Sequence, residues 1–442
     1  MTARLAPTSL KDVGALLAFA TASHVRAAAF LVVVSLVAFL PGFFNIPPVD
    51  RDEARFAQAT RQMIESGDYI DIRFQDEVRY KKPVGIYWLQ AAAVKTAEKL
   101  GIPDAHTTIW LYRLPSLFGA IGAVLLTYWA ALAFVSRRLA YLAGLMMASS
   151  VLLGVEARLA KTDAVLLLCC VAAMGVMARA YLRQSLGRDV SWPHAAMLWT
   201  AIAVGILVKG PLILMVTGLC AVALSIADRS ARWLMRLRPL PGIVWVLLIV
   251  LPWFIAIMAK SGDSFLQESV GGDLLSKVFH GQESHGAPPG YYLVLFWLTF
   301  WPAAPLAAVA APSAWRERRE PALRFLLAWI VPSWIVFELV ITKLPHYVLP
   351  LYPAIAILIA RAIEQRSLSR NPHLTRFSVM WPFFAALLPA GAIILLIWMR
   401  GQFGWVGRSP PARRSSASMR GGSMMSRAPN ARSRARAPRR SS

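Results

Sequence analysis

The sequence predicts an all-α fold, a polytopic bundle of about 11 transmembrane helices whose first large loop carries short helices. Of its 442 residues, 57% are hydrophobic and only 16% are charged, and the mean hydropathy is +0.52. A soluble domain needs more polar surface than this, so lipid must solvate much of the chain. The apolar runs are also continuous, which favours helices over the short alternating segments of a barrel.

Eleven apolar stretches are long enough for a hydrocarbon core of roughly 30 Å, which takes about 20 helical residues to cross. The break between the fifth and sixth stretches, at Lys209-Gly210-Pro211, is the least secure boundary. The first stretch follows basic residues but has no small-residue cleavage site, so we expect an uncleaved anchor. The three cysteines fall inside helices and are interpreted as small core residues. The stretches lie near 27–46, 110–135, 138–156, 163–182, 195–209, 210–227, 240–259, 290–312, 323–342, 345–362 and 378–399.

The basic residues behind the net charge of +24 are concentrated in loops on one side of the predicted membrane. With the N-terminus in the cytoplasm, the inner loops carry the arginine clusters at 137–138, 179–188, 229–238, 316–324 and 361–376, whereas the short outer loops carry few bases. This asymmetry follows the positive-inside rule and sets the orientation. The excess of basic residues therefore reflects the orientation of the chain in the membrane. We expect contact with membrane lipids and no nucleic-acid partner.

Residues 1–400 are expected to form one transmembrane domain, followed by an Arg/Ser-rich tail over 401–442. From Gly407 onward the tail holds ten arginines and no Lys, Asp or Glu. One interpretation is a disordered basic arm that contacts anionic lipid head groups. The other interpretation, which we favour, is a misread reading frame, because a sequence rich in Arg, Ser, Pro and Ala is typical of a GC-rich gene read out of frame. We assign the tail no function.

Ionisable residues collect at the outer boundary of the predicted helices. Glu156, Arg158, Lys161, Asp163, Lys209, Glu338, Lys343 and His346 all lie there. The two large loops on the same side, 47–108 and 260–289, hold 14 of the 23 acidic residues. Charges next to a membrane are costly and tend to mark function, so the crowding predicts a catalytic surface at this boundary.

Two segments of the first outer loop carry the chemistry. A helix beginning near Asp50, after Pro47-Pro48, would place carboxylates in its first turn and put Asp52 and Arg55 on one face. A capped surface helix with ordinary ion pairs explains this spacing equally well. The second segment, Lys81-Lys82-Pro83 followed by Tyr87-Trp88, suits an anionic head group. Simple aromatic anchoring at the interface is the alternative interpretation.

Six motifs in order, over residues 45 to about 360, resemble the superfamily of protein O-mannosyltransferases and lipid A aminoarabinose transferases. The resemblance lies in Asp-Glu-x-Arg-Phe with Met-x-x-Ser-Gly-Asp, and in Tyr-x-Lys-Pro-x-x-x-Tyr-Trp. The remaining motifs are Lys161-Thr162-Asp163, Val208-Lys209-Gly210-Pro211, His285-x-x-Pro-x-x-Tyr-Tyr, and Thr342-Lys343-Leu344-Pro345-His346-Tyr347 with its continuation to Pro353.

This resemblance implies the GT-C architecture, a helix bundle with its catalytic site on the extracytoplasmic face. It implies a glycosyltransferase of the bacterial inner membrane that takes a hexose or pentose from a polyprenyl-phosphate donor. The acceptor would be lipid A, another glycan or a protein. Nucleotide sugars are scarce outside the cytoplasm, which agrees with a lipid-linked donor.

The matched motifs imply roles for individual residues. Asp52 matches the first-loop acid that orients or deprotonates the acceptor, with Glu53 and Asp163 as supporting carboxylates. Arg55 and Lys82, with Lys343 behind them, would stabilise the leaving phosphate. Tyr87 and His346 are further site candidates, and His285 matches a histidine associated with a divalent metal. Aminoarabinose transferases have an acid just before the motif lysine, where this chain has Lys81, and metal dependence is left open.

Two other classes of function compete with the enzyme. A lipid or solute transporter would take up a labelled polyprenyl lipid without sugar transfer, but transporters more often carry charges at mid-membrane on interrupted helices in two matching halves. No internal repeat is present in the sequence. A non-catalytic membrane scaffold would bind the donor lipid without turnover and would tolerate replacement of Asp52.

Overall fold

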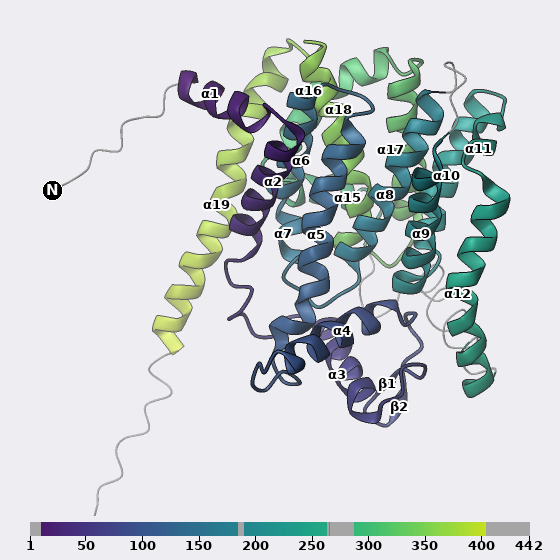
Figure 1. Cartoon of the computed structure of the whole chain (residues 1–442). Coiled ribbons are helices and arrows are strands. Elements are labelled where there is room, and N and C mark those ends of the chain that lie inside the picture. Colours follow the sequence, from purple (N-terminus) through teal and green to yellow (C-terminus); the bar gives the residue numbers. More distant parts are fainter. Residues whose placement is uncertain (1–9, 184–189, 263–264, 266–286, 404–442) are drawn as a thin grey trace, which may run out of the picture. The chain divides into compact units, whose positions relative to one another are not determined.

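Helices make up nearly all of the regular structure, as the composition predicts (Figure 1). The computed structural model describes residues 10–183, 190–262, 265 and 287–403. Within this part of the chain, the strands are confined to one antiparallel hairpin of β1 (Arg73–Phe74) and β2 (Glu77–Val78). The described residues up to Leu387 belong to one compact unit, and those from Leu388 to Phe403 belong to a second. The site described below belongs wholly to the first unit.

Six helical segments of the described residues are long and apolar enough to cross a membrane. A bent pair, α1 (Leu10–Ala20) and α2 (His24–Phe39), turns by 113° and makes a seventh if it counts as one span. The shorter helix α10 (Leu212–Ala227) is also apolar. The six are α5 (Ile109–Ala131), α8 (Asp163–Leu182), α9 (Trp192–Lys209), α12 (Pro239–Ser261), α17 (Pro321–Leu339), and the 3-10 helix η3 (Pro345–Leu351) continued by α18 (Tyr352–Glu364).

Two of the predicted apolar stretches are broken helices rather than continuous ones. The stretch 138–156 divides into α6 (Arg137–Ala148) and α7 (Val151–Glu156), and 290–312 divides into α15 (Tyr291–Thr299) and α16 (Ala304–Arg316). Serine side chains compete for backbone partners in the first break, and Pro302 has no N–H to continue the helix in the second. The two breaks meet, because the Ser150 hydroxyl donates to the carbonyl of Thr299 at 3.1 Å.

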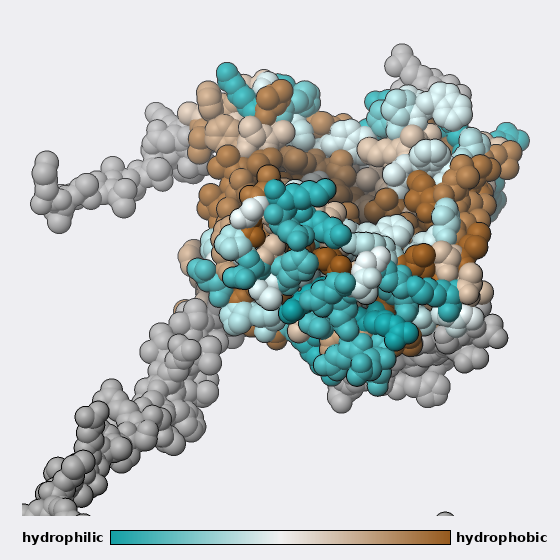
Figure 2. All heavy atoms as spheres, turned by 60° about the horizontal axis from the view of Figure 1, so that its bottom comes forward, coloured by the Kyte–Doolittle hydropathy of each residue, from teal (hydrophilic) through white to brown (hydrophobic). Residues whose placement is uncertain are grey.

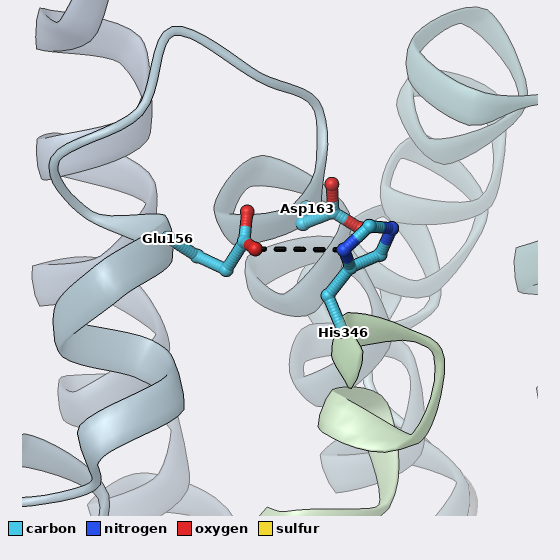
Figure 3. A group of neighbouring side chains, drawn as sticks. All are labelled: Glu156, Asp163 and His346. Carbon is cyan, nitrogen blue, oxygen red and sulfur yellow. Dashed lines mark ion pairs between the residues drawn. The ribbon is translucent and has the colours of Figure 1, made fainter. Parts of the chain in front are cut away.

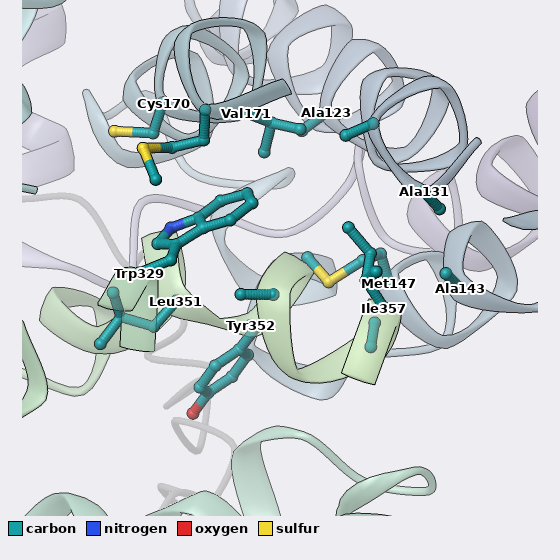
Figure 4. Close-up of a cluster of buried hydrophobic side chains, with 14 of the residues drawn as sticks. Ala123, Ala131, Ala143, Met147, Cys170, Val171, Trp329, Leu351, Tyr352 and Ile357 are labelled. Carbon is teal, nitrogen blue, oxygen red and sulfur yellow. The ribbon is translucent and has the colours of Figure 1, made fainter. Parts of the chain in front are cut away.

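The core lies around α8, whose apolar window is 83% buried. Helices α5, α9 and α17 pack against it. Gly119 of α5 allows close approach, since a Cβ there would lie 2.9 Å from the backbone of Ala164. Figure 4 shows Trp329 beside Cys170 in this cluster, with Tyr352 farther from Cys170. As predicted, the cysteines Cys169, Cys170 and Cys220 are buried and unpaired core residues.

Helix α12 lies at the edge of the bundle and faces lipid. Only 22% of its apolar window is buried, and Leu240, Ile243 and Leu248 are exposed along it. The preceding short helix α11 (Arg232–Met235) and the N-terminus of α12 lie at the opposite end of the bundle from the first loop (Figure 1). Helix α19 (Pro372–Phe403) extends from the first unit into the second.

The first loop folds into helix α3 (Arg51–Ser66), the hairpin and helix α4 (Gly85–Lys99), which cover one end of the bundle (Figure 1). Helix α4 contacts α9 closely, because a Cβ on Gly85 would lie 2.8 Å from the carbonyl carbon of Leu207. Figure 2 shows hydrophilic residues gathered over this end of the molecule, with hydrophobic helix sides beside them. The loop is therefore a fixed polar cap on an apolar bundle.

Candidate active site

The start of α3 is fixed by a capping aspartate, as the sequence predicts. The Oδ1 atom of Asp50 accepts a hydrogen bond from the backbone N–H of Asp52 at 2.7 Å, which satisfies an amide of the first turn. Its Oδ2 atom accepts from Lys161 Nζ at 2.9 Å. Burial raises the pKa of Asp50, but the hydrogen bond and charge of Lys161 outweigh it, and the net pKa is lowered. Asp50 thus joins α3 to the link between α7 and α8.

Glu53 is fully buried and anchors α3 to the bundle. Arg113 of α5, also fully buried, donates from Nε to Glu53 Oε1 at 2.7 Å and from Nη2 to Oε2 at 3.2 Å. The N–H of Ala160 donates to the same carboxylate at 3.1 Å. Arg113 also donates to the carbonyls of Phe43 and Ile46. These bonds commit Glu53 to holding the helix in place.

Asp52 points away from this anchor and remains accessible. Its side chain is 44% exposed, and its Oδ1 atom lies 3.7 Å from Arg55 and 3.9 Å from Arg79. Both distances exceed hydrogen-bond range, so these ion pairs leave the carboxylate able to accept another partner. Phe56 of the same helix packs against Tyr87 of α4, with ring centroids 5.5 Å apart. Burial raises the pKa of the Tyr87 phenol to about 12.

A second cluster joins the connection between α7 and α8 to η3, which is distant in sequence (Figure 3). Glu156 ends α7, Asp163 begins α8, and His346 lies in η3. The imidazole Nδ1 lies 3.5 Å from Glu156 Oε1, and its Nε2 lies 3.6 Å from Asp163 Oδ1. All three residues are buried, and their donor atoms are close enough together to hold a metal ion.

Two lysines already pair with this cluster. Lys209 forms an ion pair with Asp163, and Lys161 lies 3.9 Å from Glu156. Burial lowers the pKa of Lys161, but the carboxylates of Glu156, Asp163 and Asp50 outweigh that effect and raise it. Lys161 therefore stays an ammonium at neutral pH and connects the cluster to the start of α3.

The other predicted site residues have diverse surroundings. Lys82 donates to the carbonyl of Lys81 at 3.0 Å and lies near enough to His346 for their charges to interact. Lys343 is 4% exposed and donates to the carbonyls of Glu338 and Val340, at the end of α17. His285, the predicted metal ligand, lies outside the described residues. The structure does describe Lys81. This lysine stands at the position where the resemblance to aminoarabinose transferases implies an acidic residue.

Three residues near the site, Arg79, Arg113 and Glu156, were not predicted from the sequence to be site residues. An arginine four residues into an apolar helix, such as Arg113, needs a buried partner, and this signal could have identified it. Glu156 was noted only as a boundary charge. Arg79 gives no sequence signal, because its place beside Asp52 depends on how the hairpin folds back over α3.

The buried pair can be tested by stability. Replacing Arg113 with methionine leaves the Glu53 charge buried, so Arg113→Met is expected to lower the free energy of unfolding by about 3–5 kcal/mol. Adding Glu53→Gln should cost less than the sum of the two single changes, since the residues interact directly. Denaturation of the full chain in detergent measures this.

The control is Arg61→Gln, which removes an exposed partner of Glu65 on the same helix and should have little effect. If Arg113→Met were as stable as this control, the pair would not be the anchor described here.

Comparisons with known proteins identify the family of the chain. The model of the dolichyl-phosphate-mannose-protein mannosyltransferase family matches residues 29–263, which include α3, the hairpin and the Glu156–Asp163 segment. The undecaprenyl phosphate-alpha-4-amino-4-deoxy-L-arabinose arabinosyl transferase of Pectobacterium carotovorum subsp. carotovorum (strain PC1) is 28% identical over 364 residues, 79% of this chain and 63% of that protein. The enzyme of that name from Yersinia pestis (strain Pestoides F) is 28% identical over 311 residues, 70% of this chain and 54% of that protein.

Two solved structures share the fold. ArnT from Cupriavidus metallidurans bound to undecaprenyl phosphate superposes with a TM-score of 0.66 at 21% identity, over 84% of this chain and 72% of that one. The archaeal oligosaccharyltransferase AglB from Archaeoglobus fulgidus gives 0.52 at 14% identity, over 84% and 55%. The chain spans about 63% of the length of the first of these enzyme relatives.

The family model covers more than half of the 442 residues. The predicted membership, a multi-pass membrane protein of the GT-C glycosyltransferase superfamily, is confirmed: the chain belongs to the dolichyl-phosphate-mannose-protein mannosyltransferase family.

Proposed function

We propose that this protein transfers a sugar from a polyprenyl-phosphate carrier to a lipid A, glycan or protein acceptor. The observation that carries the proposal is Asp52, an accessible carboxylate at the polar end of an apolar bundle, with two arginines within 4 Å. The relatives support the choice of donor, because two are named for undecaprenyl phosphate sugars and a similar structure contains undecaprenyl phosphate.

In this reaction, a hydroxyl or other nucleophilic group of the acceptor attacks the anomeric carbon of the sugar. Asp52 accepts the proton from the acceptor as the new bond forms. The bond between the anomeric carbon and the phosphate oxygen breaks, and its electron pair remains on the phosphate. Arg55 and Lys82 stabilise that charge, which is largest when the bond is broken.

The remaining candidates support these groups. Glu53 holds the helix on which Asp52 lies, through Arg113. Asp163 and His346 belong to the charged cluster that Lys161 connects to Asp50. The Lys343 ammonium donates hydrogen bonds to backbone carbonyls, so it would stabilise the phosphate by its charge and not by direct contact. Tyr87 packs against Phe56 where α3 contacts α4.

We also propose that the site lies on the extracytoplasmic side of the bacterial inner membrane. The arginine-rich connections lie at the end opposite α3, and the positive-inside rule puts them in the cytoplasm. A reporter fused after Arg238 is therefore expected in the cytoplasm, and one inserted at Asp104 outside it. Paired phosphatase and fluorescent-protein fusions measure both. Finding the two positions on one side would contradict this orientation.

Any divalent ion that the chain takes up is proposed to bind Glu156, Asp163 and His346. Two carboxylates and an imidazole suit zinc or manganese, and Lys161 and Lys209 would have to turn aside. After dialysis against zinc, mass spectrometry should find bound metal in the wild type and in His106→Ala, but much less in Glu156→Gln. Equal metal in the two variants would contradict this assignment.

The proposed chemistry is tested by separating donor binding from transfer. Asp52→Asn keeps the shape of the side chain but removes the charge needed to accept a proton, so transfer should be abolished while donor lipid still binds. Lys82→Ala removes a cation and should weaken donor binding by about 1.5–3 kcal/mol, roughly ten- to a hundredfold. Both variants are made in the full chain, purified in detergent and assayed with labelled donor.

Matched controls lie in the same loop. Asp76→Asn, in the exposed turn of the hairpin, and Lys99→Ala, on the exposed end of α4, should leave binding and transfer unchanged. Normal transfer by Asp52→Asn would end its assignment as the base. Donor uptake without any transfer by the wild type would instead point to a transporter.

A further inference from the structure

Arg79 is a buried arginine next to the proposed catalytic carboxylate. It follows β2, and its backbone N–H donates to the carbonyl of Ile72 at 2.8 Å, which fixes the main chain. The side chain is 8% exposed, and the guanidinium carbon lies 5.3 Å from the centre of the Phe56 ring. The backbone bond and the ring contact both limit where this guanidinium can turn.

Two buried donors at this point lack an acceptor. Among the described residues, Arg79 Nε and the Tyr87 hydroxyl are both buried, and neither donates a hydrogen bond. The two side chains are neighbours, and the Tyr87 oxygen can accept from the Arg79 guanidinium, but Tyr87 gives Arg79 Nε no acceptor and its own O–H remains without one. Buried donors in native proteins nearly always have an acceptor. Asp52 does not fill this role, because its oxygen lies 3.9 Å from Arg79 Nη2, outside hydrogen-bond range.

The chemistry of the missing acceptor can be specified. A guanidinium offers several N–H groups in a planar fork, which matches the oxygens of a phosphate better than a single hydroxyl or carbonyl. Arg55 adds a second cation at 3.7 Å from the same Asp52 oxygen. A ligand that contacts both guanidinium groups is best matched by an anion.

We propose that Arg79 and Tyr87 donate hydrogen bonds to the phosphate of the lipid-linked donor and form, with Arg55, its binding subsite. This rests on the proposed function and adds a cation that the sequence motifs do not identify. When the bond between the anomeric carbon and the phosphate oxygen breaks, the electron pair moves onto the phosphate that Arg79 contacts. The acceptor proton goes to Asp52.

Binding of three probes to the purified full chain tests this subsite. Undecaprenyl phosphate carries the proposed phosphate, undecaprenol has the same chain without it, and phosphatidylglycerol is an unrelated anionic lipid. Arg79→Gln is expected to weaken undecaprenyl phosphate binding about ten- to a hundredfold, as for one charge-assisted hydrogen bond. Binding of undecaprenol should not change, although a purely structural role for Arg79 would impair both.

Two further variants distinguish the loss of a phosphate contact from misfolding. Tyr87→Phe keeps the ring against Phe56 and removes only the hydroxyl, so phosphate-lipid binding should fall by roughly two- to tenfold. Arg73→Gln, in the same hairpin, removes an exposed arginine that pairs with Asp71 and should bind like the wild type. Thermal unfolding of each variant confirms the fold.

The outcomes separate this inference from the proposed function. In the first outcome, the wild type binds undecaprenyl phosphate, and Arg79→Gln and Tyr87→Phe bind it equally well. The proposed subsite would then be wrong, with water as the acceptor for the two buried donors, and the assignment of the donor would stand. If phosphatidylglycerol competes equally with undecaprenyl phosphate, the subsite is not selective for the donor and the inference fails. If the wild type binds no undecaprenyl phosphate, the proposed donor fails and the subsite with it.

Discussion

The buried ion pair between Glu53 and Arg113 is the constraint on which the site depends. Both side chains are fully enclosed, and the two hydrogen bonds between them are supplemented by the N–H of Ala160. Neighbouring residues of a helix point about 100° apart, so fixing Glu53 inward turns Asp52 outward. Arg113 also holds the carbonyls of Phe43 and Ile46, and the chain therefore enters the loop along one path. One pair thus orients the helix, its entry and the exposed carboxylate.

Around this anchor, ion pairs link one element to the next. Asp50 pairs with Lys161, Asp163 pairs with Lys209, and Glu156 and His346 lie between these two pairs. Desolvating one charged member of a pair alone is costly, and pairing offsets much of that cost. The connection between α7 and α8 contributes two groups to this network. The N–H of Ala160 donates to Glu53, and Lys161 donates to Asp50. The result is a polar site on rigid supports, which catalytic geometry requires.

Hydropathy and charge asymmetry predicted the bundle, and the spacing of Asp50, Asp52 and Arg55 predicted the capped helix that the structure contains. The breaks within 138–156 and 290–312 were missed, because hydropathy measures how apolar a stretch is and not how straight it is. The pairing of Glu53 with Arg113 spans 60 residues. No local pattern encodes such a contact, and the same holds for Arg79 beside Asp52. The roles of Asp52, Lys82 and Lys343 stay predictions.

The central claim is that the reacting phosphate is bound at the first-loop end of the bundle, against the exposed face of α3. The most direct test is an electron cryo-microscopy structure of the full chain in a lipid nanodisc with undecaprenyl phosphate. We expect the phosphate within hydrogen-bond distance of Arg55 or Arg79, beside Asp52, with the Glu53–Arg113 pair intact. A phosphate bound at the opposite, arginine-rich end, or an Asp52 side chain turned into the core, would contradict this account.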